Sequence, residues 1–166
     1  MKIGIVSDTH GKARRLAAAL EAFAQRDVEA VVHCGDVGSV ECVEMLGACG
    51  RPAYLVAGNM DRHAEQLRVT AERCGVNFSW EVVQVPIKDG ELLVATHSHD
   101  EGLLGALIVG QQFAFICHGH THRFRDEHIG RARLINPGAL YHPRDHIRSV
   151  AVLDTQSGQL ERIEIR

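Results

Sequence analysis

The opening half of the chain alternates short apolar runs with amphipathic stretches, and this alternation limits the fold more than any other feature. Three apolar runs have the length of buried strands; they span residues 3–6, 30–34 and 53–57. The first run is followed by Leu16, Leu20 and Phe23 at helical spacing, and the second by a stretch that Ser39 can cap. Strands that alternate with helices predict a βαβαβ arrangement around a parallel sheet.

The second half of the chain predicts a hairpin and then further strands. Residues 82–87 form an apolar run, Asp89 and Gly90 are a turn signal, and residues 92–95 form the returning strand. Pro86 predicts that the first strand of this pair lies at a sheet edge or ends there. The other expected elements are a helix at residues 101–111 and strands at residues 113–117, 134–135, 149–154 and 160–165.

The composition is that of an ordinary globular protein, and we expect residues 1–166 to form a single domain. Lysine and arginine number 18 against 21 aspartates and glutamates, a net charge of −3, which argues against strong binding of nucleic acids or anionic membranes. No signal peptide or membrane-spanning run is visible. The 5 cysteines lack a C-x-x-C motif, so we expect reduced thiols and a cytoplasmic location.

Side chains that bind metals follow directly after the predicted strands. These residues are Asp8, His10, Asp36, Asn59, His97, His120 and His122. The carboxyl ends of parallel strands are where ligand sites form, so we expect the seven side chains to meet at one crevice. Imidazole and carboxylate ligands without thiolate suit Mn, Fe, Zn, Ni or Co and argue against a cysteine-rich zinc site. Seven candidates exceed the four ligands of one tetrahedral ion, which favours two ions about 3.5–4 Å apart that share a carboxylate.

The spacing of these residues gives a local argument for the same site. If the D-x-H and H-x-H segments are extended, residues two apart project to the same side of the chain. Asp8 and His10 then face one site together, as do His120 and His122, while Thr121 points away. The glycine before His120 leaves room for a close approach of the chain.

Five motifs follow one another along the chain: Asp8-Thr9-His10, Gly35-Asp36, Gly58-Asn59-Met60-Asp61, His97 and Gly119-His120-Thr121-His122. Their order resembles that of the calcineurin-like metallophosphoesterases. The length and spacing of the chain resemble the small bacterial and archaeal phosphodiesterases of that superfamily. The turn at residues 136–138 also resembles one that is usual in this branch.

The resemblance implies an α/β fold, a four-layer α/β/β/α sandwich with two mixed β-sheets. It also implies two divalent metal ions that share Asp36. One ion is then held by Asp8, His10, Asp36 and His122, and the other by Asp36, Asn59, His97 and His120. We expect Mn²⁺, with Ni²⁺, Zn²⁺, Fe²⁺, Co²⁺ and Mg²⁺ as alternatives.

The reaction implied by the resemblance is hydrolysis of a small-molecule phosphate ester, with a diester favoured. A hydroxide that bridges the two ions attacks the phosphorus in line. We assign catalytic roles to Asp36 and Asn59, and expect Asp61 to orient a ligand or hold a loop. Larger phosphatases of the superfamily carry a histidine where this chain has Met60, so water or His99 is left as the proton donor to the leaving group.

Several alternatives remain open. A phosphomonoesterase or nucleotidase needs additional positive charge to hold a dianion, and the clustered Arg123, Arg125, Arg131 and Arg133 are expected on a solvated face. A retromer subunit resembles this fold and serves as a scaffold after losing ligand residues, whereas all seven positions are filled here. A homodimer through residues 82–87 or 103–109 is possible, although both segments are equally explained as core.

Overall fold

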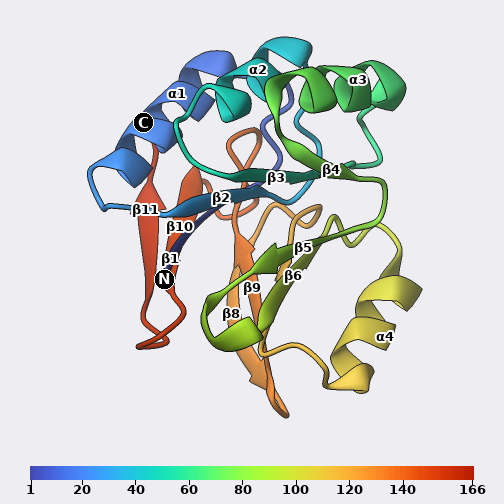
Figure 1. Cartoon of the computed structure of the whole chain (residues 1–166), viewed down its shortest axis with the longest axis vertical. Helices are drawn as coiled ribbons and strands as arrows, with labels where there is room; N and C mark the ends of the chain where they lie inside the picture. The colour runs from blue at the N-terminus through green and yellow to red at the C-terminus, as the bar shows by residue number, and fades with distance from the viewer.

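The computed structural model describes all 166 residues apart from the side chain of Asp89. Two β-sheets lie face to face, with three helices covering one outer face and one helix covering the other (Figure 1). This arrangement confirms the predicted α/β/β/α sandwich with two mixed sheets. The helices are α1 (Ala13–Ala24), α2 (Val40–Gly47) and α3 (Ala64–Cys74) on the first sheet and α4 (Glu101–Gly110) on the second.

The first sheet has the strand order β11-β10-β1-β2-β3-β4. Its strands are β1 (Lys2–Val6), β2 (Ala30–His33), β3 (Ala53–Val56), β4 (Asn77–Ser79), β10 (Ser149–Asp154) and β11 (Leu160–Glu164). Strands β1 to β4 are parallel, as the alternation of strands and helices predicts, while β10 runs antiparallel to β1. The carboxyl ends of the first three strands therefore lie together at one edge of the sheet.

The second sheet has the strand order β5-β6-β7-β9-β8. Its strands are β5 (Val82–Pro86), β6 (Leu92–Thr96), β7 (Phe115–His118), β8 (Phe124–Ile129) and β9 (Ala132–Pro137). The predicted hairpin is confirmed, because β5 and β6 pair antiparallel across the short 3₁₀ turn η1 (Lys88–Gly90). Pro86 is the last residue of the edge strand β5, where its missing N–H leaves no ladder bond unmade.

Three apolar layers hold the four structural layers together. Phe23 of α1 packs on the outer face of the first sheet, and Gly4 admits its ring because a Cβ there would lie only 2.7 Å from Phe23 Cδ2. Ile5 and Leu93 belong to the layer between the two sheets, and Ile116 to the layer beneath α4. Each buried apolar side chain of this size contributes roughly 1.5–3 kcal/mol to folding.

Side-chain caps begin two of the four helices, α2 and α4, each of which follows a loop that carries site residues. The Ser39 hydroxyl accepts a hydrogen bond from Cys42 N at 3.2 Å, which confirms the predicted N-cap of α2. The Asp100 carboxylate accepts one from Leu103 N at 3.0 Å at the start of α4. These caps fix where each helix begins relative to the polar loop before it.

Two strands lie where none is predicted. Strand β4 has only three residues, and β8 is polar on both faces. Of the arginines expected on a solvated face, Arg123 and Arg131 are exposed, whereas the Arg133 side chain is only 12% exposed and pairs with Asp126 at 2.7 Å across the β8–β9 hairpin. All five cysteines are free, and within the described chain no helix has both the length and the apolar character to span a membrane.

Candidate metal centre

All seven predicted ligand residues lie in loops that follow strands of both sheets. Asp8 and His10 follow β1, Asp36 follows β2, and Asn59 follows β3. The second sheet adds the residues after β6 and β7, which are His97, His120 and His122. The structure brings these side chains into two adjacent groups, described below as the first and second clusters.

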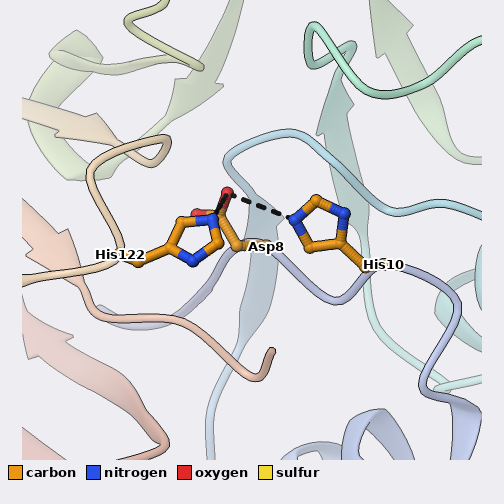
Figure 2. Close-up of side chains that lie close together, drawn as sticks. All are labelled: Asp8, His10 and His122. Atoms are coloured by element: carbon orange, nitrogen blue, oxygen red, sulfur yellow. Dashed lines mark ion pairs between the residues drawn. The ribbon is translucent and has the colours of Figure 1, made fainter. Parts of the chain in front are cut away.

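The first cluster consists of Asp8, His10 and His122, with Asp8 between the two imidazoles (Figure 2). His122 Nε2 lies 3.1 Å from Asp8 Oδ1, and His10 Nε2 lies 3.9 Å from the same oxygen. Asp36 extends the cluster, because its Oδ2 lies 3.6 Å from His10 Nε2. These distances place two nitrogens and two carboxylates around one small volume.

The second cluster consists of Asp36, Asn59, His97 and His120. The Asp36 Oδ2 that faces His10 also lies 3.3 Å from His97 Nε2. Asn59 Oδ1 lies 3.0 Å from His97 Nε2 and 3.1 Å from His120 Nδ1. Asp36 thus contacts imidazoles of both clusters, and a carboxylate oxygen of Asp8 also lies within 4.8 Å of ligand atoms of Asp36 and His97.

The donor atoms of the first cluster lack hydrogen-bond partners. Asp8 is fully buried, and its Oδ1 accepts no hydrogen bond from any described residue. His10 Nε2 is likewise buried without a hydrogen-bond partner within the described part of the chain. Leaving a buried carboxylate oxygen unpaired costs about 1–3 kcal/mol or more. A divalent cation removes that cost, so the residues fit a metal ion that takes nitrogen and oxygen ligands.

The backbone at the site differs from the prediction. Asp8, His10, Asp36, His120 and His122 all have positive φ, between 47° and 67°. The extended conformation expected for the D-x-H and H-x-H segments is therefore wrong, because these segments lie in tight loops beyond the strand ends. A residue other than glycine rarely adopts this region, and its cost of about 1–2 kcal/mol is borne by the surrounding structure.

The loop that bears His120 and His122 packs closely against the loop after β1. His120 N donates to Asp8 Oδ2 at 3.1 Å, and the Ser7 hydroxyl donates to the same oxygen at 2.6 Å. A Cβ at Gly119 would collide with Ser7 Oγ and lie 2.9 Å from Asp8 Oδ2, so the predicted close approach at this glycine is confirmed. Ser7 was not among the predicted site residues, although it directly precedes Asp8 in the sequence.

Backbone carbonyls orient two of the imidazoles. His97 Nδ1 lies 2.8 Å from the Cys34 carbonyl, and His122 Nδ1 lies 3.0 Å from the His142 carbonyl. Because a carbonyl only accepts, each Nδ1 carries the proton, which directs Nε2 of each ring toward its cluster. No side-chain pattern in the sequence signals these carbonyl contacts.

Asp61 and Met60 hold the loop that carries Asn59. Asp61 Oδ1 accepts from Gly38 N and its Oδ2 from Gly58 N, both at 2.8 Å, so this carboxylate joins two loops of the site. Met60 N donates to Asp36 Oδ1 at 2.8 Å, while the Met60 side chain is 46% exposed. Asp61 occupies the place expected of a residue that positions ligands.

His99 lies at the rim of the second cluster. Its ring centroid is 5.6 Å from that of His97 and 6.3 Å from that of His120. The residue is exposed, whereas His97 is buried. The structure therefore places His99 beside the ligand set and outside it, and its role as a proton donor stays a prediction.

Burial and the neighbouring carboxylates shift the pKa values of the four histidines in opposite directions. The negatively charged Asp8 carboxylate, 3.1 Å from His122 Nε2, raises the pKa of His122. Burial alone would lower the pKa of His97, but its hydrogen bond and attraction to Asp36 raise it overall. Burial lowers the pKa of His10 and of His120. Since a metal binds the neutral imidazole, protons compete with the metal at all four rings.

Comparisons with known proteins identify the family of this chain. Residues 1–158 match the calcineurin-like phosphoesterase superfamily domain. The chain is similar to phosphodiesterase MJ0936 of Methanocaldococcus jannaschii, with 29% identity over 164 residues that cover 98% of each chain.

Solved structures show the same fold. An archaeal phosphodiesterase superposes with a TM-score of 0.89 and 27% identity, covering 99% of this chain and 100% of that one. A Vps29 mutant from Entamoeba histolytica superposes with a TM-score of 0.66 at 19% identity, covering 100% of both chains, which shows similarity of fold alone. The match over residues 1–158 shows that the chain belongs to the calcineurin-like phosphoesterase superfamily.

Proposed function

We propose that this protein is a phosphodiesterase that uses two divalent metal ions to hydrolyse a small-molecule phosphate diester. The observation that carries the proposal is the pair of clusters around Asp36, with unpaired donor atoms in Asp8 and His10. Family membership and the phosphodiesterase relatives support a hydrolase that acts on phosphate esters. The mixed nitrogen and oxygen donors suit Mn²⁺.

In this proposal each cluster holds one ion, and Asp36 contacts both. The first ion takes Asp8, His10, Asp36 and His122, and the second takes Asp36, Asn59, His97 and His120. When bound, the ions supply positive charge that neutralises phosphate oxygens and lowers the pKa of the attacking water. Asp61 fixes the positions of Asp36 and Asn59 relative to each other, because its carboxylate accepts hydrogen bonds from the two loops that carry them.

The site has no side chain directly after Asn59 that can donate a proton to the leaving group. Met60 cannot donate a proton, and its exposed side chain lies directly after Asn59. We propose water or His99 for this step, since the His99 ring lies at the rim of the second cluster. Diesters with good leaving groups, which need little protonation, are then the fastest substrates.

The scaffold alternative has less support than the enzyme. The Vps29 structure shares the fold at 19% identity. A scaffold gains nothing from a buried, unpaired carboxylate oxygen, which destabilises the folded chain. The monoesterase alternative differs from the main proposal in its substrate and is separated from it by the assay below.

The test compares hydrolysis of bis(p-nitrophenyl) phosphate with hydrolysis of p-nitrophenyl phosphate. Protein stripped of metal is given Mn²⁺, Ni²⁺, Zn²⁺ or Mg²⁺ in turn. We expect no turnover without metal and a preference for the diester with Mn²⁺. Preference for the monoester would establish the phosphatase alternative. Full activity of the stripped protein would contradict the role of metals, and no turnover despite bound ions would favour the scaffold.

A further inference from the structure

An open pocket adjoins the first cluster. It is lined by His10 and His122 and by the loop between β9 and β10, through residues 141–144 and His146. Two predicted metal ligands thus form part of its surface, so a group bound there lies beside the reacting phosphate. The loop residues play no part in the proposed hydrolysis itself, apart from the His142 carbonyl that orients His122.

The loop that lines the pocket is held in place at several points. Tyr141 N donates to the Asp8 carbonyl at 3.0 Å, and Arg144 N donates to the His122 carbonyl at 2.8 Å. His142 and His146 both have positive φ, 46° and 64°, which the surrounding contacts must enforce. The pocket wall is therefore a built part of the site and not a loosely attached loop.

The pocket is cationic. The Arg144 side chain is exposed and forms no ion pair with any acidic side chain that the structure describes. Asp145, the acid of this loop, is turned to Arg162 and does not line the pocket. Lys12 adds a positive charge near the pocket, since its Nζ lies 5.0 Å from the centre of the Tyr141 ring.

A second pocket beside the site has a different character. It is lined by residues 38–40 and 60–63 with Gln66 and Leu67, and therefore includes both the exposed Arg62 and the buried carboxylate of Asp61. Met60 adds an apolar surface there. Arg62 thus shares its pocket with a carboxylate, whereas no carboxylate lines the pocket at Arg144, so the pocket at Arg144 favours an anion more strongly.

We propose that Arg144 selects esters that carry a second anionic group, a carboxylate or a phosphate, beside the phosphate that reacts. This inference rests on the proposed function, because it names the class of substrate that the same site takes. A guanidinium binds either anion through two parallel hydrogen bonds. The net charge of −3 gives the chain no general attraction for anions, so the selection has to be local.

The test uses two diesters that differ in charge and have nearly the same shape. These are p-nitrophenyl 3-carboxyphenyl phosphate and p-nitrophenyl 3-carbamoylphenyl phosphate, with a 3-phosphonophenyl ester as a third substrate that separates phosphate-like anions from carboxylates. With Mn²⁺ bound, we expect kcat/KM to be about 10-fold higher for at least one anionic ester than for the carboxamide. In Arg144→Gln that preference falls below about 2-fold, while the carboxamide ester is cleaved as before.

Arg131→Gln is the matched control, because this exposed arginine lies in the β8–β9 hairpin and lines a different pocket. It removes the same charge and should retain the preference. A preference that survives in Arg144→Gln, or its absence from the wild-type protein, would overturn the inference.

Failure of the proposed function is recognised separately. It would appear as no cleavage of the carboxamide ester by the wild-type protein. Binding to the pocket is then measured by calorimetry on the Mn²⁺-loaded protein with (3-carboxyphenyl)phosphonate, benzene-1,3-diphosphonate and (3-carbamoylphenyl)phosphonate. The inference expects at least one of the two ligands with a second anionic group to bind about 10-fold more tightly than the carboxamide, and Arg144→Gln to remove the difference. Equal affinities of the wild-type protein for all three ligands would overturn it.

Discussion

The two clusters of the metal centre share Asp36 but differ in how their polar atoms are satisfied. In the first cluster, Asp8 Oδ1 and His10 Nε2 are buried and lack hydrogen-bond partners among the described residues. In the second, Asn59 Oδ1 lies within hydrogen-bond distance of both His97 and His120. The first cluster is thus prepared for a cation, whereas in the second cluster the Asn59 oxygen already has His120 Nδ1 as a hydrogen-bond donor.

This difference implies that the two ions bind unequally. An ion in the first cluster gains ligands that had no other partner, and it also removes the cost of leaving them unpaired. An ion in the second cluster displaces the hydrogen bond that His120 Nδ1 is able to donate to Asn59 Oδ1. We therefore expect the first cluster to hold its ion more tightly, and the predictions below test this asymmetry.

The largest effect is expected for Asp36→Ala, which removes the carboxylate common to both clusters. Both ions should be lost, and diester hydrolysis should fall by at least about 1,000-fold, because each ion contributes several kcal/mol to stabilising the transition state. Metal analysis and kcat/KM measure the two effects. Asp126→Ala is the control, since that carboxylate pairs with Arg133 in the β8–β9 hairpin. Retention of both ions by Asp36→Ala would show that the clusters do not depend on Asp36.

A pair of histidine variants compares the clusters directly. His122→Ala should weaken the tighter Mn²⁺ binding step by about 100-fold or more, because it removes a ligand from the first cluster. His120→Ala should leave the tighter step unchanged and weaken the second. Calorimetric titration of each metal-free variant with Mn²⁺ separates the steps. Loss of the tighter step in His120→Ala, with its retention in His122→Ala, would reverse the proposed asymmetry.

The buried His33, which contacts the loop of Asp8 and His10 through Thr9, predicts that the stability of the protein depends on pH. His33 is fully buried, and its Nε2 lies 2.9 Å from the hydroxyl of Thr9, between Asp8 and His10 in the sequence. Burial lowers the pKa of His33 from 6.5 to about 4. Between these values the unfolded chain takes up a proton that the folded chain excludes. The stabilisation is therefore complete above pH 6.5 and is lost as the pH falls toward 4.

Urea unfolding of the metal-free protein measures this loss. From pH 7 to pH 5, His33 should account for about 2 kcal/mol of the decrease in the free energy of unfolding. His33→Asn removes the titrating ring, so the variant should lose less stability than the wild-type protein over this range. An identical pH dependence in both proteins would show that His33 does not titrate as described.

A smaller effect is expected on the side of the second cluster. Met60→His places a proton donor directly after Asn59, where this chain has an exposed methionine. The variant should raise kcat by about 10-fold for diesters with poor leaving groups and little for p-nitrophenyl esters. The dependence of kcat on the pKa of the leaving group measures this change. An unaltered dependence would mean that proton donation does not limit the reaction.

The parallel part of the fold and the location of the site follow from local signals in the sequence. Apolar runs of strand length predict β1, β2 and β3, and the polar residues after them predict where the metal ligands meet. The Ser39 cap is predicted as well, because it depends on a single side chain and the next turn of backbone. Each of these features depends on residues that lie within a few positions of one another in the chain.

Other features depend on contacts that the sequence does not display. Strand β8 is polar on both faces because it is an edge strand, and it is held mainly by its pairing with β9. The left-handed backbone at Asp8 and His122 is imposed by packing between loops of the two sheets. The carbonyl of His142 orients His122 through a main-chain atom, which carries no residue-specific signal. The homodimer and the identity of the metal stay predictions.

The central claim is that Asp36 joins two metal sites. Crystals grown with Mn²⁺ and measured near the manganese absorption edge test it most directly. The account predicts two anomalous peaks about 3.5–4 Å apart, one beside Asp8 and His10 and one beside Asn59 and His97, with Asp36 between them. At limiting Mn²⁺, the peak beside Asp8 and His10 should be the stronger. A single peak at saturating Mn²⁺, or none, would contradict the account.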